Sequence, residues 1–178
     1  MDEKTRLIRA GAPAHSHGPA PVTTVAPMIQ KGSTVLLPNA AALYDDTAYV
    51  TYGRGGLVAH NALKEGLCAL EGACSVSLYP SGVAALTGAM LAVLKAGDDV
   101  LVVDNIYKPT RRFCDEVLGR FGVTTRYFDP RLSPKALLDM ASPATRLIVL
   151  ESPGSLTFEM QDLAAIAALA RARNILTL

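Results

Sequence analysis

The sequence predicts an α/β fold in which a mostly parallel sheet is covered by helices on both faces. After residue 56, short continuous apolar runs alternate with helical patterns of about three turns. Strands that are apolar throughout are typical of parallel sheets buried on both sides. Residues 1–56 contain five prolines and no sustained period, so we expect an extended arm with short turns there.

The first predicted helix and strand precede a small-residue turn. Leu63, Leu67 and Leu70 recur at helical spacing and predict a helix over residues 60–70. Residues 74–79 are strand-like. Residues 83–94 are helical, and Gly97 supplies the residue type that commonly ends a helix.

The later elements alternate to the end of the sequence. Pro109 opens one helix, and Ser133 followed by Pro134 caps another. The predicted order is strand 100–103, helix 109–119, strand 123–128, helix 133–140, strand 147–150, helix 162–173 and strand 175–178. Right-handed crossovers would join these strands.

Composition argues against several classes of protein. The formal net charge is only +1, whereas a nucleic-acid surface needs a clustered basic excess; Arg111–Arg112 and Arg171–Arg173 are interpreted as solvated helix faces. No apolar run approaches the roughly 20 residues of a membrane span. The start of the chain has no secretory signal pattern, so we expect a cytoplasmic protein.

Cysteine and histidine give no strong metal or disulfide pattern. Cys68, Cys74 and Cys114 are an odd number without a C-x-x-C pair, which fits reduced thiols. His15 and His17 form an H-x-H in a stretch rich in proline, glycine and alanine. Two histidines without a third ligand are a weak metal signal, and we expect no metal.

Candidate ligand groups follow the predicted strands. Ligands of open parallel sheets bind beyond the carboxyl ends of the strands. The turn Ser81-Gly82-Val83 offers backbone N–H groups and a hydroxyl at a helix start, which suits a phosphate; an ordinary turn explains it as well. Tyr107 offers a ring for stacking or for core packing. The other residues that follow strands are 104–106, 129–130 and 151–153.

Tyr52 and Arg54 form a second polar pair. They lie two apart on a segment expected to be extended, so both side chains would point the same way. A phenol beside a guanidinium suits a phosphate. The glycines around them leave the backbone open to close approach by a ligand or another chain.

Together these motifs resemble the amino-terminal half of the trans-sulfuration enzymes. This family depends on pyridoxal phosphate and has the aspartate-aminotransferase-like fold type I. The resemblance is nearest to the cystathionine β-lyase branch, because γ-lyases and γ-synthases usually carry Asn where this chain has Ser155. The motifs are Tyr52-Gly-Arg54-Gly-Gly, Leu70-Glu-Gly72, Pro80-Ser-Gly-Val-Ala-Ala85, Gly97-Asp-Asp-Val100, Tyr107, Phe128-Asp-Pro130 and Leu150-Glu-Ser-Pro-Gly-Ser155.

The resemblance implies a cofactor role for several residues. The amides of Gly82 and Val83 would bind the phosphate of pyridoxal phosphate, with Ser81 at the rim. Tyr107 would stack on the pyridine ring and take part in proton handling. The residues expected to shape the floor and substrate side of the pocket are Glu151, Ser152 and Ser155.

The resemblance also implies an oligomer. Residues 1–56 would contact a neighbouring subunit, with Tyr52 and Arg54 reaching into its phosphate site, and residues 57–178 would begin the cofactor-binding domain. The expected assembly is a homotetramer, built as a dimer of dimers.

The implied reaction is a carbon–sulfur β-elimination of a sulfur amino acid. Cystathionine would give homocysteine, pyruvate and ammonia, a step of methionine biosynthesis. The family needs a lysine that bonds to the cofactor and an aspartate under the ring nitrogen, and both are expected beyond Leu178. None of the six lysines fits that role, so we expect a truncated chain, inactive alone, with exposed apolar sheet surface.

Other interpretations remain open. A γ-lyase, a γ-synthase or a cysteine desulfhydrase of the same family is one. A non-catalytic chain that binds a full-length homologue is another. A generic nucleotide-binding sheet domain is a third, although the sequence lacks both G-x-G-x-x-G and G-x-x-x-x-G-K-[ST].

Overall fold

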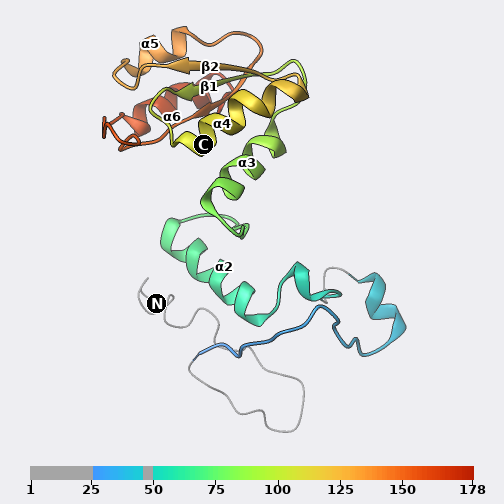
Figure 1. Cartoon of the computed structure of the whole chain (residues 1–178). Helices are drawn as coiled ribbons and strands as arrows, with labels where there is room; N and C mark the ends of the chain where they lie inside the picture. Colours follow the sequence, from blue (N-terminus) through green and yellow to red (C-terminus); the bar gives the residue numbers. More distant parts are fainter. Residues whose placement is uncertain (1–25, 46–49) are drawn as a thin grey trace. The chain divides into compact units, whose positions relative to one another are not determined.

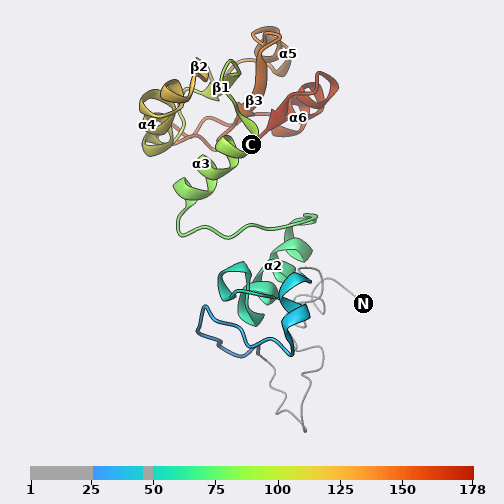
Figure 2. The ribbon, with the colours of Figure 1, turned by 90° about the vertical axis from the view of Figure 1, so that its right-hand side faces the viewer.

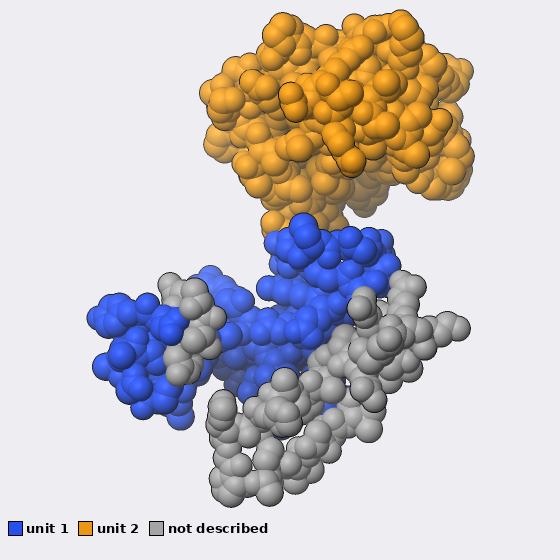
Figure 3. All heavy atoms as spheres, turned by 180° about the vertical axis from the view of Figure 1, so that it is seen from behind, with its two compact units in different colours: residues 1–78 blue, residues 79–178 orange. Residues whose placement is uncertain are grey.

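The computed structural model describes residues 26–45 and 50–178, which divide into two compact units. Unit 1 comprises residues 1–78 and unit 2 comprises residues 79–178 (Figure 3). His15 and His17 lie outside the described residues. No helix in the described part of the chain is long and apolar enough to cross a membrane.

Unit 2 contains a four-stranded parallel sheet, which confirms the predicted fold class. Its strands are β1 (Asp99–Val103), β2 (Thr124–Phe128), β3 (Thr145–Val149) and β4 (Leu176–Thr177), arranged in the order β2-β1-β3-β4. Figure 1 shows β2 beside β1. Central β1 pairs with both β2 and β3, so that Val102 lies opposite Tyr127 and Val149. All five residues of β1 are buried, as expected of a central parallel strand.

Helices cover both faces of this sheet. They are α3 (Gly82–Val93), α4 (Lys108–Glu116), α5 (Pro134–Asp139) and α6 (Leu163–Ala172). Helix α4 lies on one face, whereas α5 and α6 lie on the other (Figure 2). The core between these layers is made of the side chains of Met90, Val100, Leu101, Val102, Val103, Leu118, Leu137, Leu138, Ile148, Val149 and Ile166.

Side-chain caps start three of the helices. The hydroxyl of Ser81 accepts from the backbone N–H of Ala84 at 3.1 Å, and that of Ser133 accepts from Ala136 at 3.2 Å. The carboxylate of Asp162 accepts from Ala165 at 3.0 Å. Such caps satisfy N–H groups that the first turn leaves unpaired.

Unit 1 consists of short turns and one long helix. Its elements are η1 (Ala40–Tyr44), η2 (Gly53–Gly55) and α2 (Val58–Glu71), which ends at Gly72 in the left-handed conformation with φ 62°. An antiparallel bridge joins Thr34 to Tyr52. Whether residues 1–56 act as an arm on another subunit stays a prediction.

Three predicted elements differ in the structure. Residues 74–79 do not form a strand: they pair with none of the four strands, most are exposed, and an apolar run without a ladder partner gains nothing from a strand. Gly97 does not cap α3, whose C-cap is Leu94; with φ 88° it turns the chain into β1. Helix α4 ends at Glu116, and a 3-10 helix, η3 (Leu118–Phe121), follows it.

Candidate functional site

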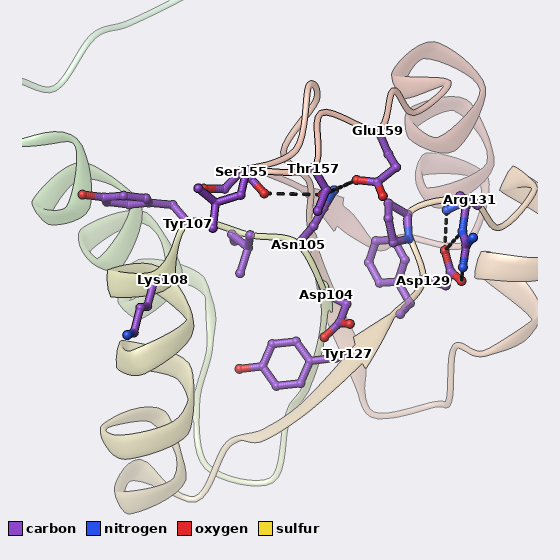
Figure 4. Close-up of a pocket in the computed structure, with 14 residues that line it drawn as sticks. Asp104, Asn105, Tyr107, Lys108, Tyr127, Asp129, Arg131, Ser155, Thr157 and Glu159 are labelled. Atoms are coloured by element: carbon purple, nitrogen blue, oxygen red, sulfur yellow. Dashed lines mark hydrogen bonds and ion pairs between the residues drawn. The ribbon is translucent and has the colours of Figure 1, made fainter.

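The carboxyl edge of the sheet is hollowed into a cavity of about 730 Å³ (Figure 4). The loops that follow β1, β2 and β3 form its walls, as open parallel sheets favour. Its lining residues are Asp104, Asn105, Ile106, Tyr107, Lys108, Tyr127, Phe128, Asp129, Pro130, Arg131, Ser155, Leu156, Thr157 and Glu159.

Tyr107 lies at the N-cap of α4 and is anchored by Glu151. The backbone N–H of Tyr107 donates to Oε2 of Glu151 at 2.9 Å, which joins the loop after β1 to the loop after β3. A carboxylate at a helix N-terminus also gains from the helix dipole. The side chain of Tyr107 is half exposed and points away from Asn105, Thr157 and Glu159 (Figure 4). The backbone of Tyr107 is therefore fixed, while its ring remains accessible.

A hydrogen-bonded cluster that the sequence did not reveal surrounds Asn105. Its side-chain Nδ2 donates to Oε2 of Glu159 at 2.7 Å and to Oγ1 of Thr157 at 3.3 Å. Its backbone carbonyl accepts from the N–H of Ser155 at 2.9 Å. The position of Asn105 just after a strand was the only signal in the sequence, and that signal is shared with many loop residues.

The predicted residues Ser152 and Ser155 belong to the same loop, but their polar groups shape the backbone. The hydroxyl of Ser152 accepts from the N–H of Gln161 at 2.9 Å. Ser155 lines the cavity and is fixed through its own N–H on Asn105. Glu151 and Ser152 are absent from the cavity lining.

The Ser81-Gly82-Val83 turn opens α3 as predicted, with Ser81 as its cap. The N–H groups of Gly82 and Val83 fall in the first helical turn, where the helix supplies no acceptor. Gly82 is exposed, so its N–H can reach a ligand. These three residues do not line the 730 Å³ cavity, whereas Tyr107 and Ser155 do, and Glu151 is joined to Tyr107 by a hydrogen bond.

Tyr52 and Arg54 form a separate site within unit 1. They line a cavity of about 440 Å³ together with Gln30, Lys31, Gly32, Ser33, Gly53, Leu57 and His60. The chain is extended at Tyr52 as expected, but it then closes into the 3-10 turn η2, in which the N–H of Gly55 donates to the carbonyl of Tyr52 at 2.9 Å. The guanidinium of Arg54 still faces the ring of Tyr52, 5.8 Å from its centroid.

Gly53 is required by close packing at that turn. A Cβ there would overlap the carbonyl oxygen of Gly32 and lie 3.1 Å from its carbonyl carbon. Since both contacts are backbone atoms, the neighbour cannot rotate away. The glycine therefore permits the close approach of this turn to the backbone of Gly32 and Ser33.

Internal pairs neutralise most charges around the 730 Å³ cavity. A hydrogen bond from Arg111 to Asp104 at 2.6 Å raises the pKa of Arg111, whose guanidinium lies 3.9 Å from the ring centroid of Tyr127. Burial raises the pKa of Tyr127, so its phenol stays protonated. On the loop after β2, hydrogen bonds from Arg131 lower the pKa of Asp129 to about 2.

Among residues 26–45 and 50–178, no cluster of His, Cys, Asp or Glu side chains could hold a metal ion. All three cysteines are free thiols. Cys114 is buried, and burial raises its pKa to about 11, so it is a packing residue with little thiolate near neutral pH.

A parallel sheet covered by helices, with a cavity beyond the carboxyl ends of its strands, defines an α/β domain of the kind that binds ligands at that edge. A family model for Cys/Met metabolism PLP-dependent enzymes matches residues 4–178. The chain belongs to this family of pyridoxal-phosphate enzymes.

Individual relatives agree with this assignment. The chain is 43% identical to a Rhizobium johnstonii protein named "Putative cystathionine beta-lyase" over 93% of this chain and 41% of that protein. It is 34% identical to cystathionine beta-lyase from Salmonella typhimurium over 94% of this chain and 42% of that one. It spans about two fifths of the length of these relatives.

A solved structure supports the fold. Cystathionine gamma-lyase from Lactobacillus plantarum, crystallised with L-serine, superposes with a TM-score of 0.83 at 28% identity, over 99% of this chain and 44% of that one. The described fold is therefore that of the amino-terminal part of fold-type I pyridoxal-phosphate enzymes.

Proposed function

We propose that this chain forms part of the cofactor site of a pyridoxal-phosphate-dependent carbon–sulfur β-lyase acting on cystathionine or a similar sulfur amino acid. The observation that carries the proposal is Tyr107, anchored by Glu151 at the carboxyl edge of a parallel sheet with its ring face free. The resemblance to cystathionine beta-lyases at 43% and 34% identity supports the choice of substrate.

The residues present fit the cofactor. The exposed start of α3 offers the N–H groups of Gly82 and Val83, which helix geometry leaves unpaired, to a phosphate. Ser81 caps the helix through its oxygen and keeps its hydroxyl proton for a ligand. Pyridoxal phosphate, when bound, supplies an electron sink for charge that develops at the substrate Cα.

This chain's own residues have distinct tasks in the proposal. Tyr107 provides a flat surface against the pyridine ring and a phenol for moving a proton near the substrate. Glu151 holds Tyr107 in place, while Ser152 and Ser155 fix the loop that forms the floor. Tyr52 and Arg54 pair a phenol with a guanidinium and would bind the phosphate of a neighbouring subunit's cofactor in a homotetramer.

We further propose that the 178-residue polypeptide cannot catalyse the reaction by itself. Lys108 is the lysine that lines the 730 Å³ cavity, and it points away from Asn105 and Asp104 (Figure 4). No lysine of this sequence matches the one that bonds the cofactor in the resemblance. A full-length subunit of the family would supply that group.

The start of α3 allows a sharp test of cofactor binding. Proline is tolerated at the first position of a helix and lacks an N–H, so Gly82→Pro deletes one phosphate donor while keeping the helix. Ser81 already has φ −158° and ψ 161°, a conformation that a following proline accepts. The control is Gly82→Ala, which keeps the N–H and whose Cβ meets nothing within 4 Å.

Pyridoxal phosphate is titrated into each variant and followed by absorbance. Loss of a hydrogen bond to a charged group predicts about 10- to 100-fold weaker binding for Gly82→Pro. Gly82→Ala and the exposed-residue control Tyr44→Leu should bind like the wild type. Equal affinity of Gly82→Pro and Gly82→Ala would refute the phosphate site.

A further inference from the structure

We propose that Asn105 is a positioning residue, which fixes Tyr107 for contact with the cofactor by tying the loop after β1 to the loop after β3. The role given to Tyr107 rests on the proposed function, whereas the tie itself is a property of the fold. Asn105 lies two residues before Tyr107, and Ile106 between them is buried.

Three hydrogen bonds join Asn105 to the loop after β3. Its carbonyl accepts from Ser155 at 2.9 Å, and its Nδ2 donates to Glu159 at 2.7 Å and to Thr157 at 3.3 Å. Thr157 also donates to the carboxylate of Glu159. The amide of Asn105 therefore joins a network in which each donor has an acceptor, and Figure 4 shows the cluster on the side of the loop opposite the ring of Tyr107.

Glu151 binds the other end of the segment from Asn105 to Tyr107. Its carboxylate accepts from the N–H of Tyr107 at 2.9 Å. The backbone from Asn105 to Tyr107 is thus fixed at both ends by residues of the loop after β3. Because Asn105 is fixed only two residues before Tyr107, the start of α4 has little freedom to shift, so the position of the Tyr107 ring depends on Asn105 as well as on Glu151.

The bond from Asn105 to Glu159 is charge-assisted. Hydrogen bonds from Thr157, from the backbone and from Asn105 lower the pKa of Glu159, so its carboxylate is ionised near neutral pH. Charge-assisted bonds are about twice as strong as neutral ones. The Asn105 Oδ1 is buried without a partner, which shows that the amide is oriented by its donor side.

Exchanging the donor and the acceptor separates positioning from simple destabilisation. Asn105→Asp places a second carboxylate against Glu159 and should break the tie by repulsion. The double variant Asn105→Asp with Glu159→Gln restores a donor opposite an acceptor with reversed polarity. The matched control is Ser142→Ala, which removes a hydroxyl bonded to Asp99 at 3.2 Å, at the opposite edge of the sheet.

Two readouts are measured on the 178-residue chain. Amide hydrogen exchange of Tyr107 and Ser155, near neutral pH, reports the tie without any cofactor. We expect about tenfold or faster exchange of both amides in Asn105→Asp, recovery to within about threefold in the double variant, and no local change in Ser142→Ala. Pyridoxal phosphate affinity, measured by titration, should fall about tenfold or more in Asn105→Asp and recover in the double variant.

The outcomes distinguish a failure of the tie between the two loops from a failure of the positioning role and from a failure of the proposed cofactor site. Unchanged exchange at Tyr107 in Asn105→Asp overturns the tie, as does a double variant that exchanges as fast as the single one. Faster exchange with unchanged cofactor affinity overturns the positioning role and leaves the tie standing. If Gly82→Pro also leaves affinity unchanged, the proposed cofactor site is what has failed.

Discussion

Gly154→Ala tests how closely the β1 and β3 loops must approach. Gly154 is buried beside Asn105, and a Cβ at this position would lie 2.8 Å from Oδ1 of Asn105 and closer still to its Nδ2 and Cγ. The side chain of asparagine is short, so its amide must rotate out of the cluster or the two loops must separate. Either movement removes the bonds from Nδ2 to Glu159 and Thr157.

The magnitude follows from those two bonds. A bond to a charged group contributes about 1.5–3 kcal/mol and a neutral one about 0.5–1.5 kcal/mol. Water can replace part of both, because Asn105 is only partly buried. Replacing glycine also stabilises by about 0.4–1 kcal/mol through the unfolded chain. The expected net loss is about 1–3 kcal/mol.

Urea and thermal unfolding of the chain measure this loss. For a unit of the size of unit 2 (residues 79–178), each kcal/mol lowers the thermal midpoint by about 4–8 °C. The control is Gly119→Ala, because a Cβ at Gly119 meets nothing within 4 Å and its φ is not positive; we expect an equal or higher midpoint there. A Gly154→Ala protein as stable as Gly119→Ala would refute the reasoning from close approach.

Three further predictions concern acid stability, thiol reactivity and the core. Burial would raise the pKa of Asp99, but hydrogen bonds from Arg126 and Thr145 outweigh it and lower the pKa. The stabilisation from the ionised carboxylate is present above about pH 4 and is lost as the pH falls through the folded pKa. Urea midpoints should therefore fall more steeply below pH 4 in the wild type than in Asp99→Asn. Cys74 is exposed and should react with a thiol reagent at once, whereas Cys114, with its pKa raised to about 11, should react only as the chain unfolds; immediate modification of both would contradict this. Leu138→Ala, at a fully buried site, should lower the free energy of unfolding by about 2–5 kcal/mol in urea titrations.

The two central strands could be predicted because β1 and β3 are largely apolar and buried. The predicted strand at 100–103 and the one at 147–150 match β1 and β3 to within two residues at each end. The failure at 74–79 has a different origin. Its sequence is equally suited to a strand, but strand formation requires a neighbour, and local sequence does not report whether one exists.

Candidate site residues could be singled out from the sequence by residue type and place, and their role in a cofactor site stays a prediction; the hydrogen-bonded network could not be found in this way. Tyr107 and the turn before α3 are recognisable as candidates from their residue types and from their positions after a strand and at a helix start. Asn105 lies 52 residues before Thr157 and 54 before Glu159, and their contact depends on the packing of β1 beside β3. Ordinary polar residues gain a role only through such a meeting.

The hydrogen bonds at the carboxyl edge are distributed unevenly, and this bears on function. Three bonds join the loops after β1 and β3: the N–H of Tyr107 donates to Glu151, Nδ2 of Asn105 donates to Glu159, and the N–H of Ser155 donates to the carbonyl of Asn105. The loop after β2 satisfies itself, since Asp129 accepts from both the backbone and the guanidinium of Arg131.

A ligand placed over β1 and β3 therefore meets groups that are already fixed, and binding there costs little ordering of the protein. A ligand over β2 would have to compete with the bonds between Arg131 and Asp129. Pre-organised groups favour precise placement of a rigid, planar molecule. The unequal bonding accordingly favours the β1 and β3 side, where Tyr107 lies, as the position of the ring in the proposed cofactor site.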